Sequence, residues 1–401
     1  MIRSVFDSLA SLKLTIGLLC AGTVLVFAGT LAQVDMGLYA AQNAYFRSLL
    51  VYWGPQGATW KIPILPGGYL VGSLMVLNLT ASLIKTFEFS RAHFGLMLSH
   101  GGVILLLIGQ LATDMLAVES HMRLGQGRPS NYSENGRDNE LVLVDITDPK
   151  QDKVVSIPEG RLAQGGRITD SGMPFTLRVL EYQRNSTVGF QMGGGGGSVT
   201  NGVAAFLRFQ KEAPVTKLEA RDIPAAAIEV LNGEKSVGAW WVSGWVEEAQ
   251  LAQSIANQAG PAVKRLLEQP QTFQSGGRTW RIALRPMRFY KPFSLELVKF
   301  THKKYSGTEI PKDFSSRVRL RRPDTGESRE VLIYMNNPLR YAGETFYQSG
   351  YDENDPSITI LQVVRNPGWL TPYLACGLVS VGLVYHFIMH LLNFTALRRK
   401  R

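Results

Sequence analysis

Four long apolar segments lie along the chain, three near the start and one near the end, around a large polar middle. Each approaches or exceeds the ~18–20 apolar residues that an α-helix needs to cross a bilayer core of about 30 Å. The pattern therefore predicts a multi-pass membrane protein. The four predicted spans run from Leu14 to Leu31, Ile64 to Ile84, Phe94 to Leu116 and Trp369 to Leu392.

The polar stretch between the third and fourth spans has the composition of a soluble domain and is long enough to bury its own core. We divide the chain into a membrane region with three helices at 1–117, an extramembrane domain at 118–368, and a last membrane helix with a basic tail at 369–401. The expected fold is an α-helical membrane protein with four transmembrane helices, three plus one, and one large mainly-β domain.

Short runs rich in β-branched or aromatic residues predict the strands of this domain, because Gly, Pro, Asn and Asp separate them. We expect a β-sandwich or an open β-barrel. An Ala-, Gln- and Leu-rich stretch from Glu247 to Glu268 instead predicts a helix broken near Gly260 and Pro261. Five glycines at 193–197 predict a flexible loop. The predicted strands are Leu141–Ile146, Phe175–Tyr182, Ala204–Phe209, Ala226–Leu231, Trp280–Leu284, Ser294–Phe300, Arg317–Leu320, Val331–Tyr334 and Ile358–Val364.

Basic residues predict the orientation of the helices. With four spans, the basic residues that flank them all fall on one side, which the positive-inside rule makes cytoplasmic. We therefore expect a protein of the bacterial inner membrane with its large domain on the periplasmic or outer face, and a first span that is not a cleaved signal peptide. The flanking residues are Arg3, Lys13, Lys85, Arg91, Arg398, Arg399, Lys400 and Arg401.

The net charge of +10 and the cysteine count narrow the functions of the domain. Basic clusters between residues 281 and 322 have two interpretations: a solvated face beside anionic lipid headgroups, or a surface for an anionic ligand or acidic partner. Nucleic acid is not expected as a partner. Cys20 and Cys376 are the only cysteines, and both lie in predicted spans, so the domain has no disulfide, no CxxC pair and no CxxCH haem-attachment site.

Three histidines lie inside predicted spans, where an ionisable side chain is a functional-site candidate. His100 stands in the third span, about 10 Å from its start at the helical rise. His386 lies at nearly the same depth in the fourth span, and His390 shares its helix face one turn away. Neutral imidazoles from two helices at one level can form a bis-histidine haem site. The alternative is that each histidine only forms a hydrogen bond to a neighbouring helix.

Glycine at positions 101 and 102 favours His100 as the ligand, because it leaves room for a flat group beside the imidazole. We interpret Asp114, His93 and His121 as interfacial residues. The WWVSGW run at 240–245 could stack on a porphyrin, but it is more typical of a sheet face or a core corner. Trp53, Trp60 and Trp369 are placed as interfacial belt residues.

The most distinctive sequence motif lies at the end of the domain. MNNPLRY at 335–341 leads to FYQSGY at 346–351, and the last span begins within about twenty residues, behind Asn366-Pro367-Gly368. Asn-Asn-Pro is a turn, and the aromatic residues with Gly343 suit a tight β corner. We expect Asn336, Asn337, Tyr347 and Gln348 to act in folding or partner docking, because their side chains are not suited to acid, base or nucleophile chemistry.

This stretch resembles the ResB family, also called CcsB, of the system II cytochrome c maturation machinery. The resemblance covers most of the chain. It includes FDSLASLKLTIGLL near the start, HGGVILLLIG from His100, and PFSLELVKFTHKKYSGTEIPKDFSSRVRL before the corner motif. The three-plus-one topology also agrees. The chain departs from the family in being shorter than many relatives, and it lacks the WGxxWxWD segment and the outward haem histidines of the family's partner protein.

The resemblance implies a membrane subunit that works with a ResC/CcsA-type partner, moves haem b outward and presents it for attachment to apocytochrome c. It implies His100 as an axial ligand of the haem iron and favours a histidine of the partner as the second ligand. Depth along the spans leaves His386 as the alternative second ligand within the chain, and His390 as a further haem-binding candidate. No residue is assigned a catalytic role, so any haem-attachment activity would belong to the complex. The alternative function is a ResB-like structural subunit that scaffolds a respiratory or multihaem complex. A transporter is disfavoured, because inverted repeats and paired broken helices are missing.

Overall fold

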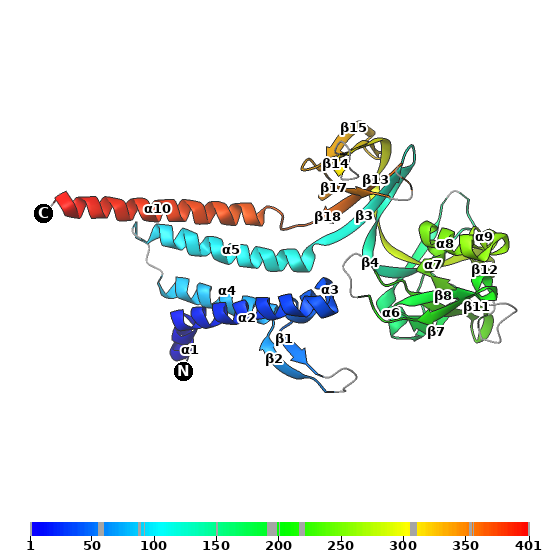
Figure 1. Ribbon diagram of the computed structural model, residues 1–401, viewed down its shortest axis with the longest axis horizontal. Helices are drawn as coiled ribbons and strands as arrows, with labels where there is room; N and C mark the ends of the chain where they lie inside the picture. The colour runs from blue at the N-terminus through cyan, green and yellow to red at the C-terminus, as the bar shows by residue number, and fades with distance from the viewer. Residues whose placement is uncertain are drawn as a thin grey trace.

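The computed structural model describes residues 2–54, 60–86, 90–91, 93–149, 151–190, 199, 201–215, 221–304, 311–352, 355 and 357–399. The long helices lie at one end of the molecule and most of the strands at the other (Figure 1). Both termini lie at the helical end, away from the β domain. This division along the long axis agrees with the predicted separation into membrane helices and one β-rich domain.

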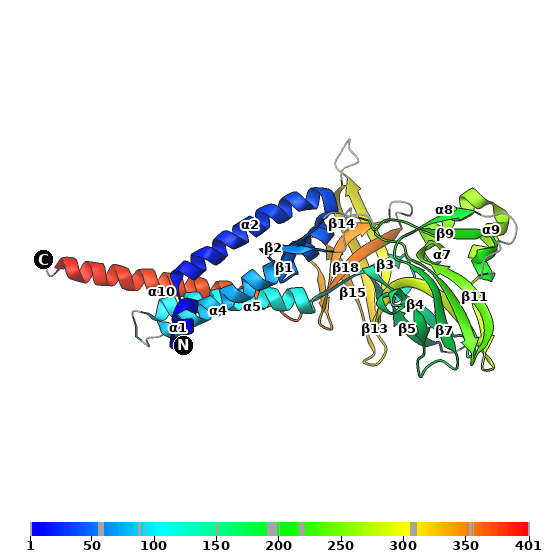
Figure 2. The same cartoon turned by 90° about the horizontal axis from the view of Figure 1, so that it is seen from below.

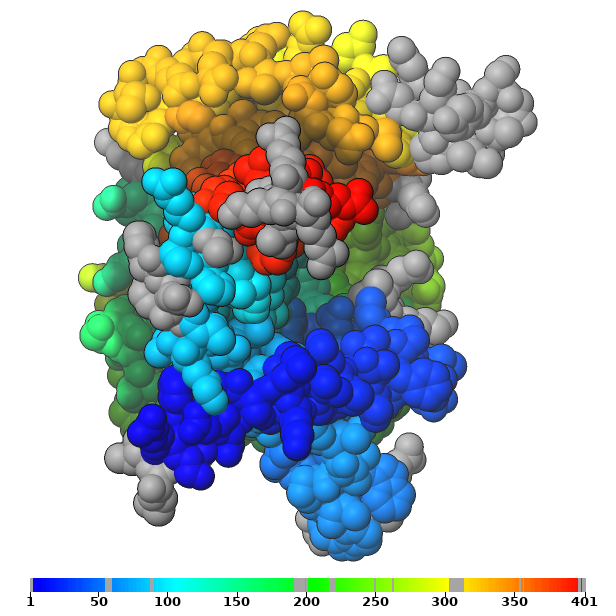
Figure 3. Space-filling model, turned by 90° about the vertical axis from the view of Figure 1, so that its left-hand side faces the viewer, coloured from blue at the N-terminus to red at the C-terminus, as the bar shows by residue number. Residues whose placement is uncertain are grey.

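Four helices in the described part of the chain are long and apolar enough to cross a membrane. The prediction of a multi-pass protein with a three-plus-one order is therefore confirmed. The spanning helices are α2 (Leu12–Met36), α4 (Gly68–Lys85), α5 (Phe94–Leu116) and α10 (Thr371–Arg399). A short helix, α1 (Ile2–Leu9), precedes them. Figure 3 looks along the bundle and shows α5 between α10 and the N-terminal helices.

The second span was predicted to begin at Ile64, and this boundary is wrong. Residues Ile62–Pro66 form strand β2, which pairs antiparallel with β1 (Leu50–Trp53), and the helix begins at Gly68. Pro63 and Pro66 disfavour the helical conformation of the residues that precede them, so the apolar run starts as a strand. The link from α2 to this hairpin consists of α3 (Leu38–Ala41) and the π-helix η1 (Gln42–Phe46).

Three glycines spaced seven residues apart hold α5 against α10. Gly95, Gly102 and Gly109 are buried, and a Cβ on any of them would collide with α10. At Gly102 it would lie 2.7 Å from Cγ2 of Val379 and 2.9 Å from the carbonyl oxygen of Ala375. Small residues at such a spacing let two membrane helices approach closely, which strengthens their van der Waals packing.

A buried amide joins α4 to the start of α2. Asn78 donates hydrogen bonds to the carbonyl oxygens of Leu9 at 2.6 Å and Ser11 at 3.2 Å, and it accepts one from Thr15 at 2.7 Å. The Asn78 side chain is fully buried. It therefore satisfies backbone carbonyl groups at the junction of α1 and α2, which a bilayer could not hydrate.

The principal sheet of the domain is antiparallel and nearly closed into a barrel. Its strands follow the order β15, β14, β13, β4, β3, β18, β17, β16, and β12 and β5 pair at its side. An isolated bridge between Tyr334 and Asn337 connects the two edges. The strands are β3 (Val118–Gly125), β4 (Pro129–Asp145), β5 (Lys153–Pro158), β12 (Thr272–Ser275), β13 (Arg278–Lys304), β14 (Pro311–Arg322), β15 (Glu327–Tyr334), β16 (Leu339–Tyr341), β17 (Glu344–Tyr351) and β18 (Ile358–Arg365).

A second lobe packs on the far part of the long strands β4 and β13 (Figure 2). Its sheet has the order β11, β10, β7, β6, and a separate hairpin pairs β8 with β9. Leu141, Ile228 and Trp280 belong to one core between the sheets. The elements are β6 (Gly166–Ile168), β7 (Thr176–Gln183), β8 (Ser186–Phe190), β9 (Leu207–Lys211), β10 (Ala225–Asn232), β11 (Lys235–Ser243), α6 (Glu159–Ala163), the 3₁₀-helix η2 (Gly202–Ala205), α7 (Gly244–Glu247), α8 (Ala249–Ala259) and α9 (Pro261–Leu267).

Most of the predicted strands lie within these elements, and the broken helix is confirmed as α8 and α9 around Gly260. The predicted strand Ala204–Phe209 is wrong in its first half. Residues Gly202–Ala205 form η2, because Gly202 has a positive φ of 64° and starts a turn, and the strand begins only at Leu207. The five glycines at 193–197 lie outside the described residues.

The tryptophan cluster at 240–245 belongs to the core. This agrees with its interpretation as a sheet face or core corner. Trp240 is buried between the sheets against Phe273, with ring centroids 5.4 Å apart. Trp241 and Trp245 pack at the edge of a second core with α8 and α9. These rings are therefore committed to packing inside the lobe.

Acidic side chains pair with most of the basic clusters on the barrel. Arg285 meets Glu140 at 2.9 Å, with both side chains nearly buried, and Lys291 meets Glu344 at 2.7 Å. A buried charge without a partner is costly, so these pairs explain why the strands tolerate so many cations. Further pairs are Arg281–Glu247, Arg288–Glu134, Arg319–Glu330, Arg321–Glu296 and Arg322–Asp324. This pairing favours the solvated-face interpretation over an anion-binding surface.

The glycine contacts of α5 make a matched pair of variants available. Gly102→Leu should destabilise the helix pair by about 1–3 kcal/mol, because the new side chain collides with Val379 and the α10 backbone. Gly101→Leu is the control, since its Cβ would meet nothing within 4 Å. Thermal unfolding of the detergent-solubilised proteins measures the difference. Equal melting temperatures for the two variants would contradict the glycine contact.

The corner motif contains a residue with a strained backbone. Asn336 has a φ of 62°, in the left-handed region that asparagine and glycine tolerate and β-branched residues avoid. Asn336→Val should therefore lower stability by about 1–2 kcal/mol, while Asn336→Gly should not. The yield and melting temperature of the purified protein test this. Equal stability of Asn336→Val and Asn336→Gly would contradict this account of the backbone.

Candidate functional site

The imidazole of His100 is half-buried on α5 and has one nitrogen engaged. Its Nδ1 lies 3.0 Å from the carbonyl oxygen of Leu96, one turn earlier. A carbonyl oxygen only accepts hydrogen bonds, so Nδ1 carries the proton and Nε2 keeps its lone pair. The local helix thus holds His100 in the tautomer that can ligate a metal or accept a hydrogen bond through Nε2. Beside it, a Cβ on Gly101 would meet nothing within 4 Å.

His100 faces away from α10. At 3.6 residues per turn it lies roughly 140–160° around the helix from Gly95 and Gly102, which touch α10. A Cβ on Gly95 would lie 2.8 Å from the backbone nitrogen of His386, so His386 sits on the glycine side of α5. The two histidines share a similar depth in sequence, but the fold places them on opposite sides of one helix.

His386 and His390 stand together on α10. Their ring centroids are 4.4 Å apart, with the rings nearly perpendicular. His386 is half-buried, and in the described part of the chain its buried Nδ1 has no hydrogen-bond partner. His390 is exposed on the helix surface. Each has the residue type and position to give a single axial ligand, and both stay candidates for haem binding.

The polar residues near the domain-facing end of the spans form a cluster that sequence reasoning missed. Asp114 accepts hydrogen bonds from Arg47 at 2.9 Å and from the hydroxyl of Tyr69 at 2.6 Å. We interpreted Asp114 as interfacial; its side chain is only 20% exposed and is fully engaged. The signal that could have revealed Arg47 and Tyr69 is the acidic residue itself, because a carboxylate in an apolar segment needs partners.

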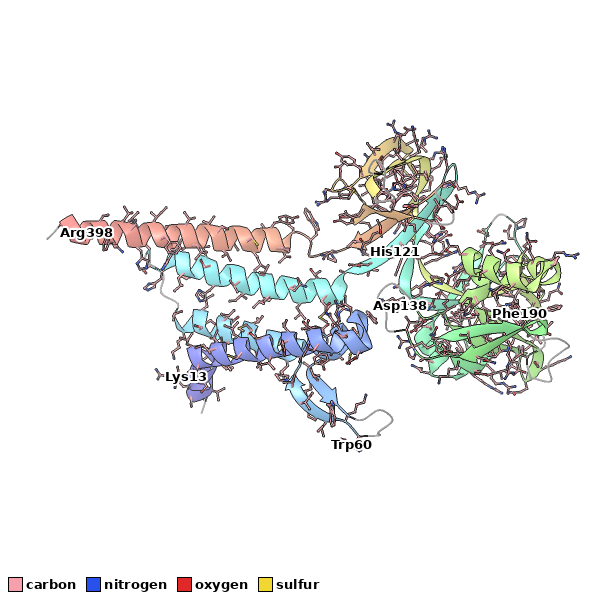
Figure 4. The ribbon with its side chains drawn as sticks, in the orientation of Figure 1. Lys13, Trp60, His121, Asp138, Phe190 and Arg398 are labelled. Carbon is pink, nitrogen blue, oxygen red and sulfur yellow. The ribbon has the colours of Figure 1, made fainter. Side chains whose placement is uncertain are left out.

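The remaining histidines have local contacts. His93 lies at the start of α5, with its Nδ1 2.9 Å from Oγ of Ser90. His121 is exposed on β3, close to the membrane helices in Figure 4. His302 packs in the barrel against Phe314 and Tyr351, with its ring centroid 4.7 Å from each of theirs. In the described residues, no group of three or more His, Cys, Asp or Glu side chains could hold a metal ion.

A small polar cleft connects the far lobe to α3. The guanidinium of Arg137 lies 4.0 Å above the ring of Tyr39, a cation–π contact between the domain and the membrane region. Nearby, Glu159 accepts a hydrogen bond from Asn139 at 2.8 Å. Burial raises the pKa of the Glu159 carboxyl, and the Asn139 bond opposes that rise. Asp138, labelled in Figure 4, lies on the same stretch.

The corner motif has structural contacts. The backbone of Asn337 accepts from and donates to Tyr334, at 3.4 and 2.9 Å, and so ties two strand ends together. The amide of Gln348 accepts a hydrogen bond from Ser316 at 2.6 Å and donates one to Thr359 at 3.0 Å. Both hydroxyl residues are fully buried, so Gln348 satisfies polar groups inside the barrel. Tyr347 is exposed. These contacts are consistent with the predicted folding role of Asn337 and Gln348.

Residues 258–360 match the model of the ResB-like family. This segment runs from the end of α8 into β18 and contains the whole corner motif. The three span histidines lie outside it. The chain is also similar to the protein NrfI of Wolinella succinogenes, with 36% identity over 107 residues. That similarity covers 27% of this chain and 12% of the relative, so it concerns one region of a longer protein.

The match covers the strands before the last span and their corner, and the resemblance to ResB proteins is confirmed over this region. The similar stretches near the start of the chain and around His100 lie outside the matched residues. The chain is a multi-pass membrane protein whose β domain contains a ResB-like region.

Proposed function

We propose that this chain is the ResB-type membrane subunit of a system II cytochrome c maturation complex, where it helps to move haem b across the membrane and to present it to apocytochrome c. The observation that carries the proposal is the ResB-like region at residues 258–360, joined through β18 and β3 to membrane helices that contain histidines. The domain lies on the periplasmic or outer face, and a ResC/CcsA-type protein is the partner.

His100 is the proposed axial ligand of the haem during its passage. The fit rests on the lone pair of Nε2, which the hydrogen bond from Nδ1 to Leu96 leaves available, and on the open space beside Gly101. Haem iron binds neutral imidazole, and a hydrogen bond at the other ring nitrogen orients such a ligand. The chain's own part is to hold the ring in place and to keep water from it.

The second axial ligand comes from the partner. His386 lies on the α10 side of α5, while His100 points to the other side, so one porphyrin cannot lie between them without rearrangement of the helices. We therefore assign the second ligand to a histidine of the partner that reaches the His100 end of this face of α5. His386 and His390 keep the role of a separate haem contact on α10.

Substitution of His100 tests the ligand role. His100→Ala should remove a low-spin haem absorption from the complex purified with its partner and should abolish cytochrome c maturation, while the protein still inserts. Added imidazole should restore part of the signal by occupying the vacant coordination position. His386→Ala and His390→Ala should leave this low-spin signal in place, because the partner supplies the second ligand and α10 lies on the other side of α5 from His100.

Two outcomes would change the assignment. If His386→Ala removes the same signal, the ligand pair lies within the chain and the helices must rearrange. If His100→Ala keeps an unchanged spectrum and full maturation activity, His100 is only a hydrogen-bonding residue. A complex without haem in every variant and in the parent protein would favour the structural-subunit alternative.

Thiol labelling tests the orientation. Lys235 is exposed at the start of β11, and Ser8 is exposed on α1 at the opposite end of the molecule. In intact cells, an impermeant thiol reagent should label Lys235→Cys and not Ser8→Cys, because the basic flanks hold α1 in the cytoplasm. Cells opened by detergent should show both. Labelling of Ser8→Cys alone in intact cells would reverse the orientation.

A further inference from the structure

A large cavity lies between the membrane helices on the side of α5 that faces α4. Its volume is about 790 Å³, within the range of small-molecule sites. The walls are apolar and come from three elements: α3 with η1, α4, and α5. The residues that shape it include Leu38, Phe46, Val76, Leu107 and Leu111.

Glycine on α4 opens the cavity. Gly72 lines it, and a Cβ on that residue would meet nothing within 4 Å. This differs from the glycines of α5 that touch α10, where the absent side chain is replaced by a neighbouring helix. At Gly72 the missing side chain leaves space. The α4 surface is thus shaped for an occupant that the described chain does not supply.

The cavity ends in a polar group of three side chains. The Asp114 carboxylate pairs with the Arg47 guanidinium, whose Nη2 lies 2.8 Å away, and accepts the Tyr69 hydroxyl at 2.6 Å. Gln42, Gln110 and Ser73 add further hydrogen-bonding groups to the lining. The ends differ in chemistry: apolar walls along the helices, and donors and acceptors at the domain-facing end.

The charges of Arg47 and Asp114 indicate which kind of ligand head group this end of the cavity can bind. Arg47 and Asp114 neutralise each other, so the site offers no net cation to a phosphate. The guanidinium has five N–H donors and spends only part of them on Asp114, and the oxygen of Tyr69 can still accept. An uncharged head group with carbonyl or hydroxyl oxygens matches these partners, and an apolar tail matches the walls.

We propose that this cavity binds an isoprenoid quinone or quinol, with its ring at Arg47, Tyr69 and Asp114 and its tail along α4 and α5 toward the bilayer. The proposal is for binding and includes no electron transfer by the chain. It goes beyond the proposed haem role and does not depend on it, since it involves neither His386 nor His390 and uses residues at the opposite end of α5 from His100.

The test uses the full-length protein purified in detergent, with decylubiquinone as the probe and extraction of co-purified native quinone as a second readout. Gly72→Leu should weaken decylubiquinone binding at least tenfold by filling the cavity. Its matched control is Gly17→Leu, on an exposed face of α2, where a Cβ also meets nothing within 4 Å. The control should bind as the parent does.

A second variant keeps the test valid if Gly72→Leu folds poorly. Tyr69→Phe keeps the ring and removes only the hydroxyl, so it should weaken binding severalfold while the protein stays folded, with only a modest fall in melting temperature from the lost hydrogen bond to Asp114. Unchanged affinity in both variants overturns the proposal. So does displacement of the probe by phosphatidylglycerol at equal concentration, which would make the cavity a phospholipid site.

A third result would assign the cavity to a protein. If Gly72→Leu loses the ResC/CcsA-type partner while native quinone is absent from the parent complex, the cavity is a groove for a partner helix and the proposal fails. The low-spin haem spectrum is recorded on every variant. A retained spectrum with lost quinone binding separates this site from the haem role, and a lost spectrum with retained quinone binding concerns the haem role alone.

Discussion

The rest of the structure depends on the continuation of one helix pair into one strand pair. α5 and α10 pack through Gly95, Gly102 and Gly109, and the chain passes from α5 into β3 and from β18 into α10. β3 and β18 pair along their whole length, from Val118 with Arg365 to Gly125 with Ile358. The tightly packed helix pair in the membrane therefore continues directly into a fully hydrogen-bonded strand pair outside it. Any movement of α5 against α10 acts on the middle of the barrel sheet.

The packing of α5 against α10 also gives α5 two different faces. One face contacts α10 closely, because its glycines have no side chains that would collide with that helix. The opposite face carries His100 near one end and Asp114 near the other, and it borders the cavity that α4 helps to form. Contacts within the chain therefore do not fully cover the face of α5 that bears its ionisable residues. This incompletely covered face is where we propose that the partner and a lipid-soluble ligand bind.

In the β domain, ion pairs and side-chain packing stabilise the long strands β4 and β13. β4 and β13 run through both lobes, and the pairs Arg285–Glu140 and Arg288–Glu134 connect them where the two lobes meet. The ResB-like region includes β13 and the strands from β14 to β17 with the corner, where Asn337 and Gln348 satisfy backbone and hydroxyl groups. The distinctive residues of the motif thus stabilise the closure of the barrel immediately before the chain returns to the membrane.

Several features of this protein follow from its sequence alone. The number of spans, the mainly-β domain, the helix broken at Gly260 and the ResB-like text are local properties, because helix length, strand composition and turn residues act over a few neighbouring positions. The depth of His100 and His386 also follows from counting residues along the spans.

Only the tertiary structure decides which residues meet. Arg47 and Asp114 are 67 residues apart in the chain, and no periodicity pairs them. The apolar run at Ile62–Pro66 reads as the start of a span until β1 offers it a partner strand. Equal depth suggested that His100 and His386 could share one haem, but the rotation of α5 about its axis separates them. That rotation is set by the close fit of Gly102 against Val379 and Ala375, a contact between residues far apart in sequence that only the folded chain defines.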